Sequence, residues 1–485
     1  MLCTGLPTIE NGRAKIVDLP SGGKGIAATY TLRSDVRWGD GAPVTTKDVL
    51  FSWRLGNQND FGFNNPELYR NIVRIDAADE RSFTLTTGHL QYDYNDVHDL
   101  QVLPEHIEGP VVAGLSNPAD YNKLSTFNRE PTNPALYNGP YLITEFKSGS
   151  HVVLTPNPRW AGDKPFFAKV TVRVIENTAA LEQNLLSGDV DYIAGEGFGL
   201  PVDQGLSVRK RFPDRFDYQF VPAQSFEHLD FQLDNPLFAD RRVRQALLYA
   251  MNRQALSDRL FEGKSPVTKT WVSLRDFGYA PEIKEYLYDQ ARARALLEEA
   301  GFKAGPDGIR VSPSGQRLSF EFRTTAGLQV RELVQQILQS QWKEIGAEAT
   351  IKNEPARTFF GETLRKRSFT GIALYAQASK PEQSPVIFLG SANIPRPENN
   401  FGGSNFPGYA NPTMDKLIAA VEVELDPAKR KLLWRDMQGL YAEDLPQIPL
   451  YFNANAFLVP KWLKGIVPTG HAYPTSYWIE RWRAE

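Results

Sequence analysis

Short stretches of alternating apolar and polar residues characterise the first 175 residues of the chain. Residues 30–33 alternate as a strand does, and residues 141–146 and 151–156 follow the turn signal Asn138-Gly139-Pro140 as two further strand candidates. In residues 169–175 three valines fall on one face, opposite lysine, threonine and arginine. This alternation predicts a strand with one buried face.

From Asp240 onward the apolar positions recur at a helical period and alternate with strand candidates. Residues 241–258, 292–299 and 331–345 are predicted helices, and a fourth begins at Pro427 with Asp426 as its cap. Gly301 suits the left-handed residue beyond a helix end. Predicted strands lie at residues 318–323, 349–352 and 371–375. The alternation predicts a mixed α/β lobe whose sheet is covered by helices.

The size and charge of the chain limit its function. With 485 residues it is too long for one compact core, so we expect about two or three domains. It carries 54 basic and 57 acidic side chains, which give a formal net charge of −3. This balance provides no long-range attraction to nucleic acid or to an anionic membrane, so neither is expected as a partner.

The residue patterns of common catalytic sites are absent from the sequence. Cys3 is the single cysteine, and the six histidines include no pair at i, i+4 and no HExxH motif. There is no GxSxG elbow, no GxxxxGKS/T loop and no GxGxxG after a strand. The acidic pair Asp189 and Asp191 is typical of solvating groups at the end of an element. We therefore expect no catalytic residue, no metal site and no cofactor; acidic pairs leave an enzyme or chaperone-like protein as the alternative.

The segment from residue 30 to residue 53, YTLRSDVRWGDGAPVTTKDVLFSW, predicts a strand, a turn and a capped helix. Gly39-Asp40-Gly41 supplies the turn, and Thr45 or Thr46 can cap a helix that runs from Lys47. This segment resembles a signature of one large family, the peptide-type extracellular solute-binding proteins (family 5) that serve ABC importers.

Five later segments resemble the same family in the same order. They are residues 138–160 with NGPY and NPRW, 185–191 (LLSGDVD), 235–253 (NPLFADRRVRQALLYAMNR), 295–301 (ALLEEAG) and 441–451 (YAEDLPQIPLY). Together with the opening segment they extend over about positions 30 to 465. By this resemblance the chain is identified as a member of the family, similar to oligopeptide- and dipeptide-binding proteins.

The resemblance implies an α/β fold, the two-lobed periplasmic binding protein of type II, cluster C, with a hinge between lobes. The expected parts are an extra domain plus the start of the first lobe at 1–136, the first lobe at 137–233, the second lobe at 234–464, and a return to the first lobe at 465–485. The implied function is non-catalytic. Ligand between the lobes stabilises their closed form, which an ABC permease then recognises.

The resemblance also implies partners and a location. The partners are a peptide or peptide-like ligand and an ABC permease in the membrane, and we expect the protein itself to be a monomer at the periplasmic or extracellular face. The sequence has neither a secretion signal nor a run of roughly 18 apolar residues. In the family a signal and a leading strand precede the motif that residues 2–12 resemble. We therefore expect a truncated or processed chain, with a sheet edge exposed by the lost strand.

One departure from the family concerns the ligand's amino group. Peptide binders of the family often hold this group with an aspartate in a WxxDYxxP segment. The corresponding stretch is residues 375–385, YAQASKPEQSP, where Ser379 or Pro381 takes that place. A buried ammonium without a carboxylate partner costs several kcal/mol. Either Glu382 substitutes for the aspartate or the ligand lacks a free amine.

The first candidate ligand-binding residues each have a structural alternative. Phe226, Glu227 and His228 lie where the family's chain crosses back from the first lobe, and the alternative is packing in the core or hinge. Arg323, at a strand end, can hold a carboxylate or form a surface salt bridge. Trp271 is a loop aromatic that serves either as a lid or as a core residue.

The remaining candidates belong to turns and strand ends. Tyr375, Gln377 and Ser379 follow a predicted parallel strand, where α/β ligand sites tend to lie; the alternative is a core tyrosine and two solvated groups. Tyr137 and Asn138 adjoin the turn at the domain junction, for which turn chemistry is the alternative. Three loop residues can offer amides and an aromatic face, unless they only connect elements: Asn400, Phe401 and Asn405.

Overall fold

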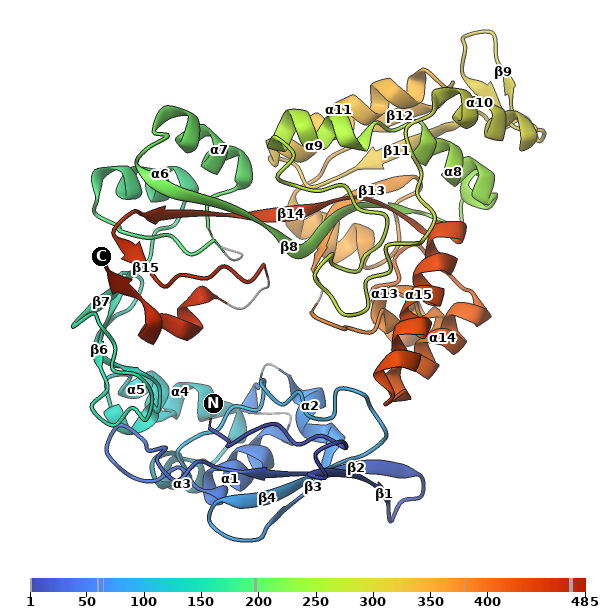
Figure 1. Ribbon diagram of the computed structural model, residues 1–485. Coiled ribbons are helices and arrows are strands. Elements are labelled where there is room, and N and C mark those ends of the chain that lie inside the picture. Colours follow the sequence, from blue (N-terminus) through green and yellow to red (C-terminus); the bar gives the residue numbers. More distant parts are fainter. Residues whose placement is uncertain (1, 59–60, 64, 196–198, 379, 471–473) are drawn as a thin grey trace. The chain divides into compact units, whose positions relative to one another are not determined.

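The computed structural model describes residues 2–58, 61–63, 65–195, 199–378, 380–470 and 474–485. The chain forms two compact units (Figure 1). Unit 1 comprises Met1–Val190, Lys461–Val467 and Thr475–Glu485, and unit 2 comprises Asp191–Pro460 and Pro468–Pro474. The domain boundaries that we expect from the family resemblance stay a prediction.

Unit 1 begins with an antiparallel sheet of order β1-β2-β4-β3. Its strands are β1 (Ala14–Asp18), β2 (Lys24–Thr31), β3 (Ile72–Ala77) and β4 (Ser82–Thr87). Of the strand predicted at residues 30–33, only residues 30 and 31 belong to a strand, as the end of the longer β2, and residues 32 and 33 lie beyond it. Tyr30 of β2 stacks on Phe83 of β4 with 5.4 Å between ring centroids, which buries the centre of the sheet.

Helix α1 (Thr46–Gly56) follows the predicted turn at Gly39-Asp40-Gly41, where Gly41 has a φ of +100°. Of the two candidate caps, Thr45 is the one that the structure uses. Its Oγ1 accepts from the Lys47 amide at 3.3 Å, and the Asp48 carboxylate accepts from the Thr45 amide at 2.8 Å. This capping box gives acceptors to backbone amides that a helix start otherwise leaves unpaired.

Replacing Thr45 by alanine is expected to destabilise α1 by about 1 kcal/mol, because a backbone donor loses its acceptor. Hydrogen exchange of the α1 amides measures this effect, and about 1 kcal/mol corresponds to about fivefold faster exchange. Thr45→Ser keeps the oxygen and is expected to exchange like the unaltered protein. Equal rates for Thr45→Ala and the unaltered protein would contradict the capping role.

The rest of unit 1 is a second sheet and a set of short helices. The sheet has the order β5-β6-β7, with β5 (Tyr141–Lys147), β6 (His151–Pro156) and β7 (Val170–Arg173). The other elements are α2 (Pro66–Asn71), α3 (Glu105–Ala113), α4 (Tyr121–Leu124), α5 (Thr126–Arg129), α6 (Thr178–Ser187), β15 (Leu463–Lys464) and β16 (Arg483–Ala484).

The prediction that the strand at residues 169–175 has a buried face is wrong. Val172 and Val174, which were expected on a buried face, are 52% and 57% exposed, and Phe146 of β5 is 49% exposed. The valines do share one face, as the alternation requires. Alternation shows which side chains share a face, but it does not show that another layer covers that face.

Unit 2 is built on a five-stranded sheet of order β12-β11-β13-β8-β14. Strand β11 is parallel to β12 and β13, whereas β8 is antiparallel to β13 and β14. The bounds are β8 (Phe216–Phe231), β11 (Ser319–Arg323), β12 (Glu348–Ile351), β13 (Ile372–Ala378) and β14 (Gln447–Pro460), and a small hairpin adds β9 (Lys303–Ala304) and β10 (Arg310–Val311).

Helices cover both faces of this sheet, as the sequence predicted (Figure 1). One face packs against α8, α10 and α11 through residues such as Leu247 and Trp342, and the other packs against α14 and α15 through residues such as Met437. The helices are α7 (Val202–Arg211), α8 (Arg241–Tyr249), α9 (Arg253–Phe261), α10 (Gln290–Glu299), α11 (Gln329–Lys343), α12 (Ala356–Thr358), α13 (Val386–Leu389), α14 (Pro412–Val423) and α15 (Pro427–Asp444).

The helix predicted at residues 241–258 is in fact two helices, α8 and α9. The chain leaves α8 at Ala250, and the Asn252 side chain caps α9 by accepting from the Ala255 amide at 3.0 Å. Arg253 then turns inward, and its guanidinium donates to the carbonyls of Thr268 and Pro449 at 2.6 and 2.7 Å. Burial lowers the pKa of Arg253 to about 10. The apolar stripe continues across the break, so periodicity alone does not reveal it.

Strand β13 extends beyond the predicted residues 371–375. It continues to Ala378, because its second half pairs with β8 from His228 back to Ser225. Tyr375 and Gln377 therefore lie within the strand and do not follow it. The strand is parallel to β11, as expected, but its other neighbour β8 is antiparallel.

Candidate functional site

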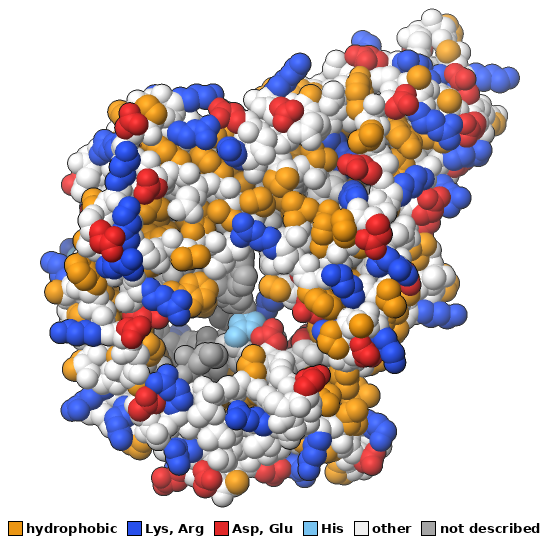
Figure 2. Space-filling view, viewed as in Figure 1, with side chains coloured by type: hydrophobic (Ala, Val, Ile, Leu, Met, Phe, Trp, Pro, Cys, Tyr) orange, Lys and Arg blue, Asp and Glu red, His pale blue; other side chains and the backbone are white. Residues whose placement is uncertain are grey.

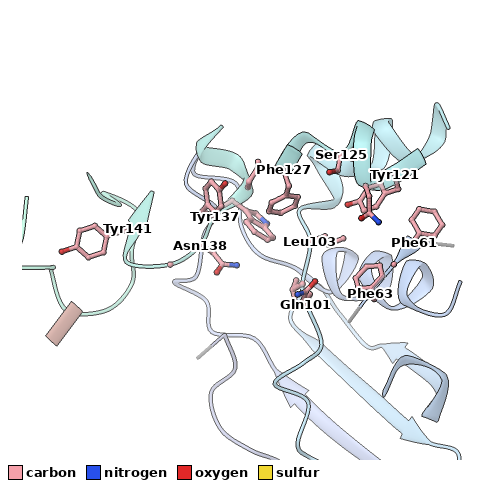
Figure 3. Close-up of a pocket in the computed structure, with 16 residues that line it drawn as sticks. Phe61, Phe63, Gln101, Leu103, Tyr121, Ser125, Phe127, Tyr137, Asn138 and Tyr141 are labelled. Atoms are coloured by element: carbon pink, nitrogen blue, oxygen red, sulfur yellow. The ribbon is translucent and has the colours of Figure 1, made fainter. Parts of the chain in front are cut away.

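Unit 1 contains a cavity of about 570 Å³ whose wall is rich in aromatic side chains (Figure 3). Two of the predicted ligand-binding residues, Tyr137 and Asn138, lie in this wall. The other residues come from the turn before α1, the loop before α2, the loop between β4 and α3, helices α4 and α5, and the segment that leads into β5: Trp38, Phe61, Gly62, Phe63, Gln101, Val102, Leu103, Tyr121, Asn122, Ser125, Phe127, Leu136, Gly139 and Tyr141. Aromatic surface with a few amides is the composition of pockets for organic ligands.

Local chemistry fixes the Tyr137 side of the cavity. The Tyr137 hydroxyl donates to the Pro131 carbonyl at 2.6 Å, and its ring meets Phe127 edge to face at 6.2 Å. The backbone at Gly39 lies close to residues 134–137. Its amide donates to the Tyr137 carbonyl, and a Cβ at this position would lie 2.4 Å from the Pro134 carbonyl oxygen, so only glycine fits. Burial raises the pKa of Tyr137, so the hydroxyl stays neutral.

The cavity wall includes two buried polar groups that make no hydrogen bond of good geometry with the described residues. The Tyr121 hydroxyl and the Trp38 indole nitrogen are buried and make no hydrogen bond of good geometry there. Burial, followed by the nearby Glu108 carboxylate, raises the pKa of Tyr121. Glu108 itself is buried and accepts from the Thr126 amide at 2.9 Å. These groups suit hydrogen bonding to a neutral ligand rather than nucleophilic chemistry.

In unit 2, the three predicted residues on β8 are all buried. Phe226 packs in the core against Phe452, 6.2 Å away between ring centroids. Glu227 accepts a two-point ion pair from Arg331 of α11, with Nη2–Oε1 at 2.9 Å and Nε–Oε2 at 3.0 Å. The carboxylate of Glu227 is therefore already paired with a cation from the same unit.

His228 belongs to a polar cluster inside unit 2. The Tyr375 hydroxyl donates to Asp230 at 2.5 Å, and the Gln447 amide donates to the other Asp230 oxygen at 2.7 Å. His228 Nε2 lies 3.3 Å from Asp230, and its ring centre is 4.3 Å from that of Tyr375. Burial, then the Asp230 carboxylate, raises the pKa of Tyr375. The structure thus brings His228 and Tyr375 together, in the interior of the unit.

Two further predicted residues have clear packing roles. Trp271 is 2% exposed and lies against Tyr441 and Phe388, with ring centroids 4.9 and 6.0 Å away. Asn405 is fully buried, and its amide donates to the carbonyls of Gly390 and Tyr409 at 3.0 and 2.8 Å. Both side chains hold unit 2 together.

The other predicted residues lie on strands and loops of unit 2. Arg323 forms salt bridges with Glu321 at 2.7 Å and with Glu354 at 3.5 Å, but its side chain is only 12% exposed, so these are not the surface pairs of the alternative. Gln377 is half-buried on β13, and Asn400 and Phe401 form a turn in which both have a φ of +54°. Ser379 lies outside the described residues.

The proposed substitute for the family's aspartate is also engaged. Glu382 accepts from Arg430 at 3.2 Å, and its amide donates to Asp276 at 2.7 Å. Burial raises the pKa of Asp276. A ligand amine would have to compete with Arg430 for the Glu382 carboxylate.

Sequence reasoning missed most of the cavity wall and the partners of the buried charges. The available signal for the wall was the density of aromatic residues in proline-interrupted loops, such as Phe61, Phe63 and Phe127. The partner of Glu227 gave no local signal, since Arg331 is 104 residues away. Only folding brings these positions together.

The molecular surface agrees with the balanced composition. On the face shown in Figure 2, basic and acidic side chains are interspersed. Within the described ranges, every helix is too short or too polar to span a membrane.

Comparison with known proteins places the chain in a family. The model of the bacterial extracellular solute-binding proteins, family 5, matches residues 24–396, and the chain belongs to this family. It is accordingly a substrate-binding component of an ABC transporter with the two-lobed type II fold, as its sequence motifs predicted. The family is one of binding proteins and is extracellular.

Individual relatives show what the chain resembles. It is 25% identical to the oligopeptide-binding protein AppA of Bacillus subtilis, over 94% of this chain and 81% of the relative. It is 26% identical to the nickel-binding periplasmic protein of Escherichia coli, over 87% and 78%. The solved oligopeptide-binding protein from Thermus thermophilus, in complex with a pentapeptide, is 32% identical, with a TM-score of 0.70 and coverage of 99% and 86%.

Proposed function

We propose that this protein captures a peptide or a peptide-like solute outside the cytoplasmic membrane and delivers it to an ABC permease, without catalysing a reaction. The observation that carries the proposal is the 32% identity to the pentapeptide-bound Thermus thermophilus protein over 99% of this chain. Hinge closure and a monomeric state belong to the same proposal. They are expected from the family and stay predictions.

The aromatic cavity of unit 1 supports an organic rather than an ionic solute. Its wall offers aromatic faces for side chains, and the amides of Gln101 and Asn138 can pair with peptide groups. We include this cavity in the ligand site, with Tyr137 and Asn138 as contacts. The polar cluster around His228 and Tyr375 then acts as support beneath the surface of unit 2.

The function is tested by thermal unfolding of the full chain with a panel of peptides of two to nine residues, followed by mass spectrometry of the peptides. A ligand bound only by the native state at about 100 times its Kd adds about 2.7 kcal/mol of stability, so at least one peptide is expected to raise Tm. The peptides are expected to be recovered intact. Peptide cleavage would overturn the non-catalytic part of the proposal. If no peptide raises Tm while a nickel–histidine complex does, the peptide part is wrong.

Replacing Tyr137 by alanine is expected to weaken peptide binding about tenfold, the usual cost of removing an aromatic contact in a binding site. Tyr288→Ala is the matched control, because Tyr288 is an exposed tyrosine of unit 2. Isothermal titration with the best peptide measures both variants. If folded Tyr137→Ala bound the peptide with unchanged affinity, the ligand site would lie outside this cavity. The proposed transport function would not be affected by that result.

A further inference from the structure

A second, smaller cavity of unit 1 has a cationic wall. It measures about 210 Å³ and shares Asn138 and Gly139 with the aromatic cavity. Three arginines and one tryptophan dominate its remaining wall, which consists of Leu2, Arg33, Val36, Arg37, Arg159, Trp160 and Ala161. Arg37 and Arg159 are exposed side chains beside this small volume, and their like charges repel one another unless an anion lies between them.

Two of these arginines have no carboxylate partner within the described part of the chain. Arg33 is neutralised by Asp35, with Nη2–Oδ2 at 2.6 Å and Nε–Oδ1 at 3.0 Å. Arg37 and Arg159, by contrast, form no ion pair with any acid of the described ranges, and Arg37 makes only a long contact of 3.5 Å to the Gly41 carbonyl. The nearby Asp40 carboxylate is engaged by His106 at 2.9 Å and by the Ala42 amide.

The side chains of Arg37 and Arg159 both approach Gly41. A Cβ on Gly41 would lie 3.6 Å from Nε of Arg159, and Arg37 reaches the carbonyl of the same residue. Gly41 also has a φ of +100°, which favours glycine. The bare backbone at this position therefore leaves room between the two cationic side chains.

The segment that carries Arg159 is firmly held. Asn157 is 4% exposed, its amide group donates to the Gly139 carbonyl at 2.8 Å, and its Oδ1 accepts from the Arg159 amide at 2.8 Å. Gly162 lets the Trp160 indole lie against the backbone, since a Cβ there would be 2.6 Å from the ring. The backbone of this part of the wall is therefore preorganised for binding.

Trp160 adds a neutral donor. Its indole nitrogen is buried and has no hydrogen-bond partner in the described part of the chain. A buried donor normally has an acceptor, so this nitrogen lacks one that a ligand oxygen can supply. Acceptor oxygens with negative charge match two guanidinium groups and one N–H together.

We propose that this cavity binds a small oxyanion, a phosphate or a carboxylate, through Arg37 and Arg159, with the Trp160 indole as a further donor. Arginine suits this role because its planar fork matches the oxygens of both anions. The site lies within unit 1 and does not depend on the proposed peptide ligand. Anion binding at this site can therefore be measured in the absence of any peptide.

Isothermal titration of the full chain at low ionic strength tests this site, with sodium phosphate in one arm and sodium acetate in the other. At least one anion is expected to bind saturably, and the two arms identify which. Arg159→Gln is expected to weaken that binding by about tenfold or more, because a charged hydrogen bond is lost. Added sodium chloride is expected to weaken it as well.

Arg54→Gln serves as the matched control, since Arg54 is an exposed arginine in the last turn of α1, outside the cavity wall. It is expected to bind the anion like the unaltered protein. Arg37→Gln gives an independent test if Arg159→Gln does not fold. Trp160→Phe is expected to weaken anion binding by a smaller factor than either arginine variant. No binding of either anion, or equal affinity in the unaltered, Arg159→Gln and Arg37→Gln proteins, would overturn the proposal.

Discussion

Replacing Arg331 by methionine is expected to lower the free energy of unfolding of unit 2 by about 3–5 kcal/mol, because it leaves the Glu227 carboxylate buried without a cation. The side chains of Arg331 and Glu227 are only 11% and 8% exposed, and they form two hydrogen bonds of 2.9 and 3.0 Å. Urea unfolding followed by tryptophan fluorescence measures the loss, since Trp342 lies in a core of this unit.

The double variant Glu227→Leu/Arg331→Met is the matched control. It removes both charges, so most of the stability is expected to return. A loss below about 1 kcal/mol for Arg331→Met would contradict a structural ion pair. If so small a loss of stability were accompanied by weaker peptide binding, Glu227 would be a ligand contact. This is the role that its position in the sequence first suggested.

Replacing Trp271 by alanine is expected to cost about 3–5 kcal/mol of unfolding free energy, because a large buried side chain leaves a cavity. Trp271 is 2% exposed and contacts Tyr441 and Phe388 in the core beneath β8 and β14. The same urea unfolding experiment measures this loss. A lid tryptophan would behave differently, with unchanged stability and weaker peptide binding.

Trp478→Ala provides the comparison for this prediction. Trp478 belongs to unit 1 and is 36% exposed, so its removal is expected to cost much less. If Trp271→Ala and Trp478→Ala lowered stability equally, the core role of Trp271 would be wrong. The choice between lid and core, which the sequence left open, is thus decided by one measurement.

Local structure was predictable wherever neighbouring residues determine it. The helix start near Thr45, the cap at Asp426 before Pro427 and the left-handed Gly301 are all present in the structure. Each depends on hydrogen bonds or backbone angles within a few residues. The split between α8 and α9 was missed because the apolar stripe passes unbroken through Met251, which is buried in the same core as both helices.

The candidate site was less predictable, because its contacts join distant parts of the chain. Of the predicted residues, Tyr137 and Asn138 lie in a cavity wall, whereas Phe226, Trp271 and Asn405 are core residues. A buried aromatic residue and a ligand-stacking one have the same sequence signature, since both are apolar and flanked by turns. Their difference is exposure, which packing alone decides.

The sequence by itself determined the family, the mixed α/β class, and the solute-binding role, because family motifs and periodicities are properties of order along the chain. The tertiary structure alone decided which side chains meet. It joined Glu227 to Arg331, enclosed an aromatic cavity beside Tyr137, and brought Arg37 and Arg159 to Gly41 without an ion-pair partner among the described residues. These contacts depend on distances between residues far apart in sequence, and no local pattern encodes such distances.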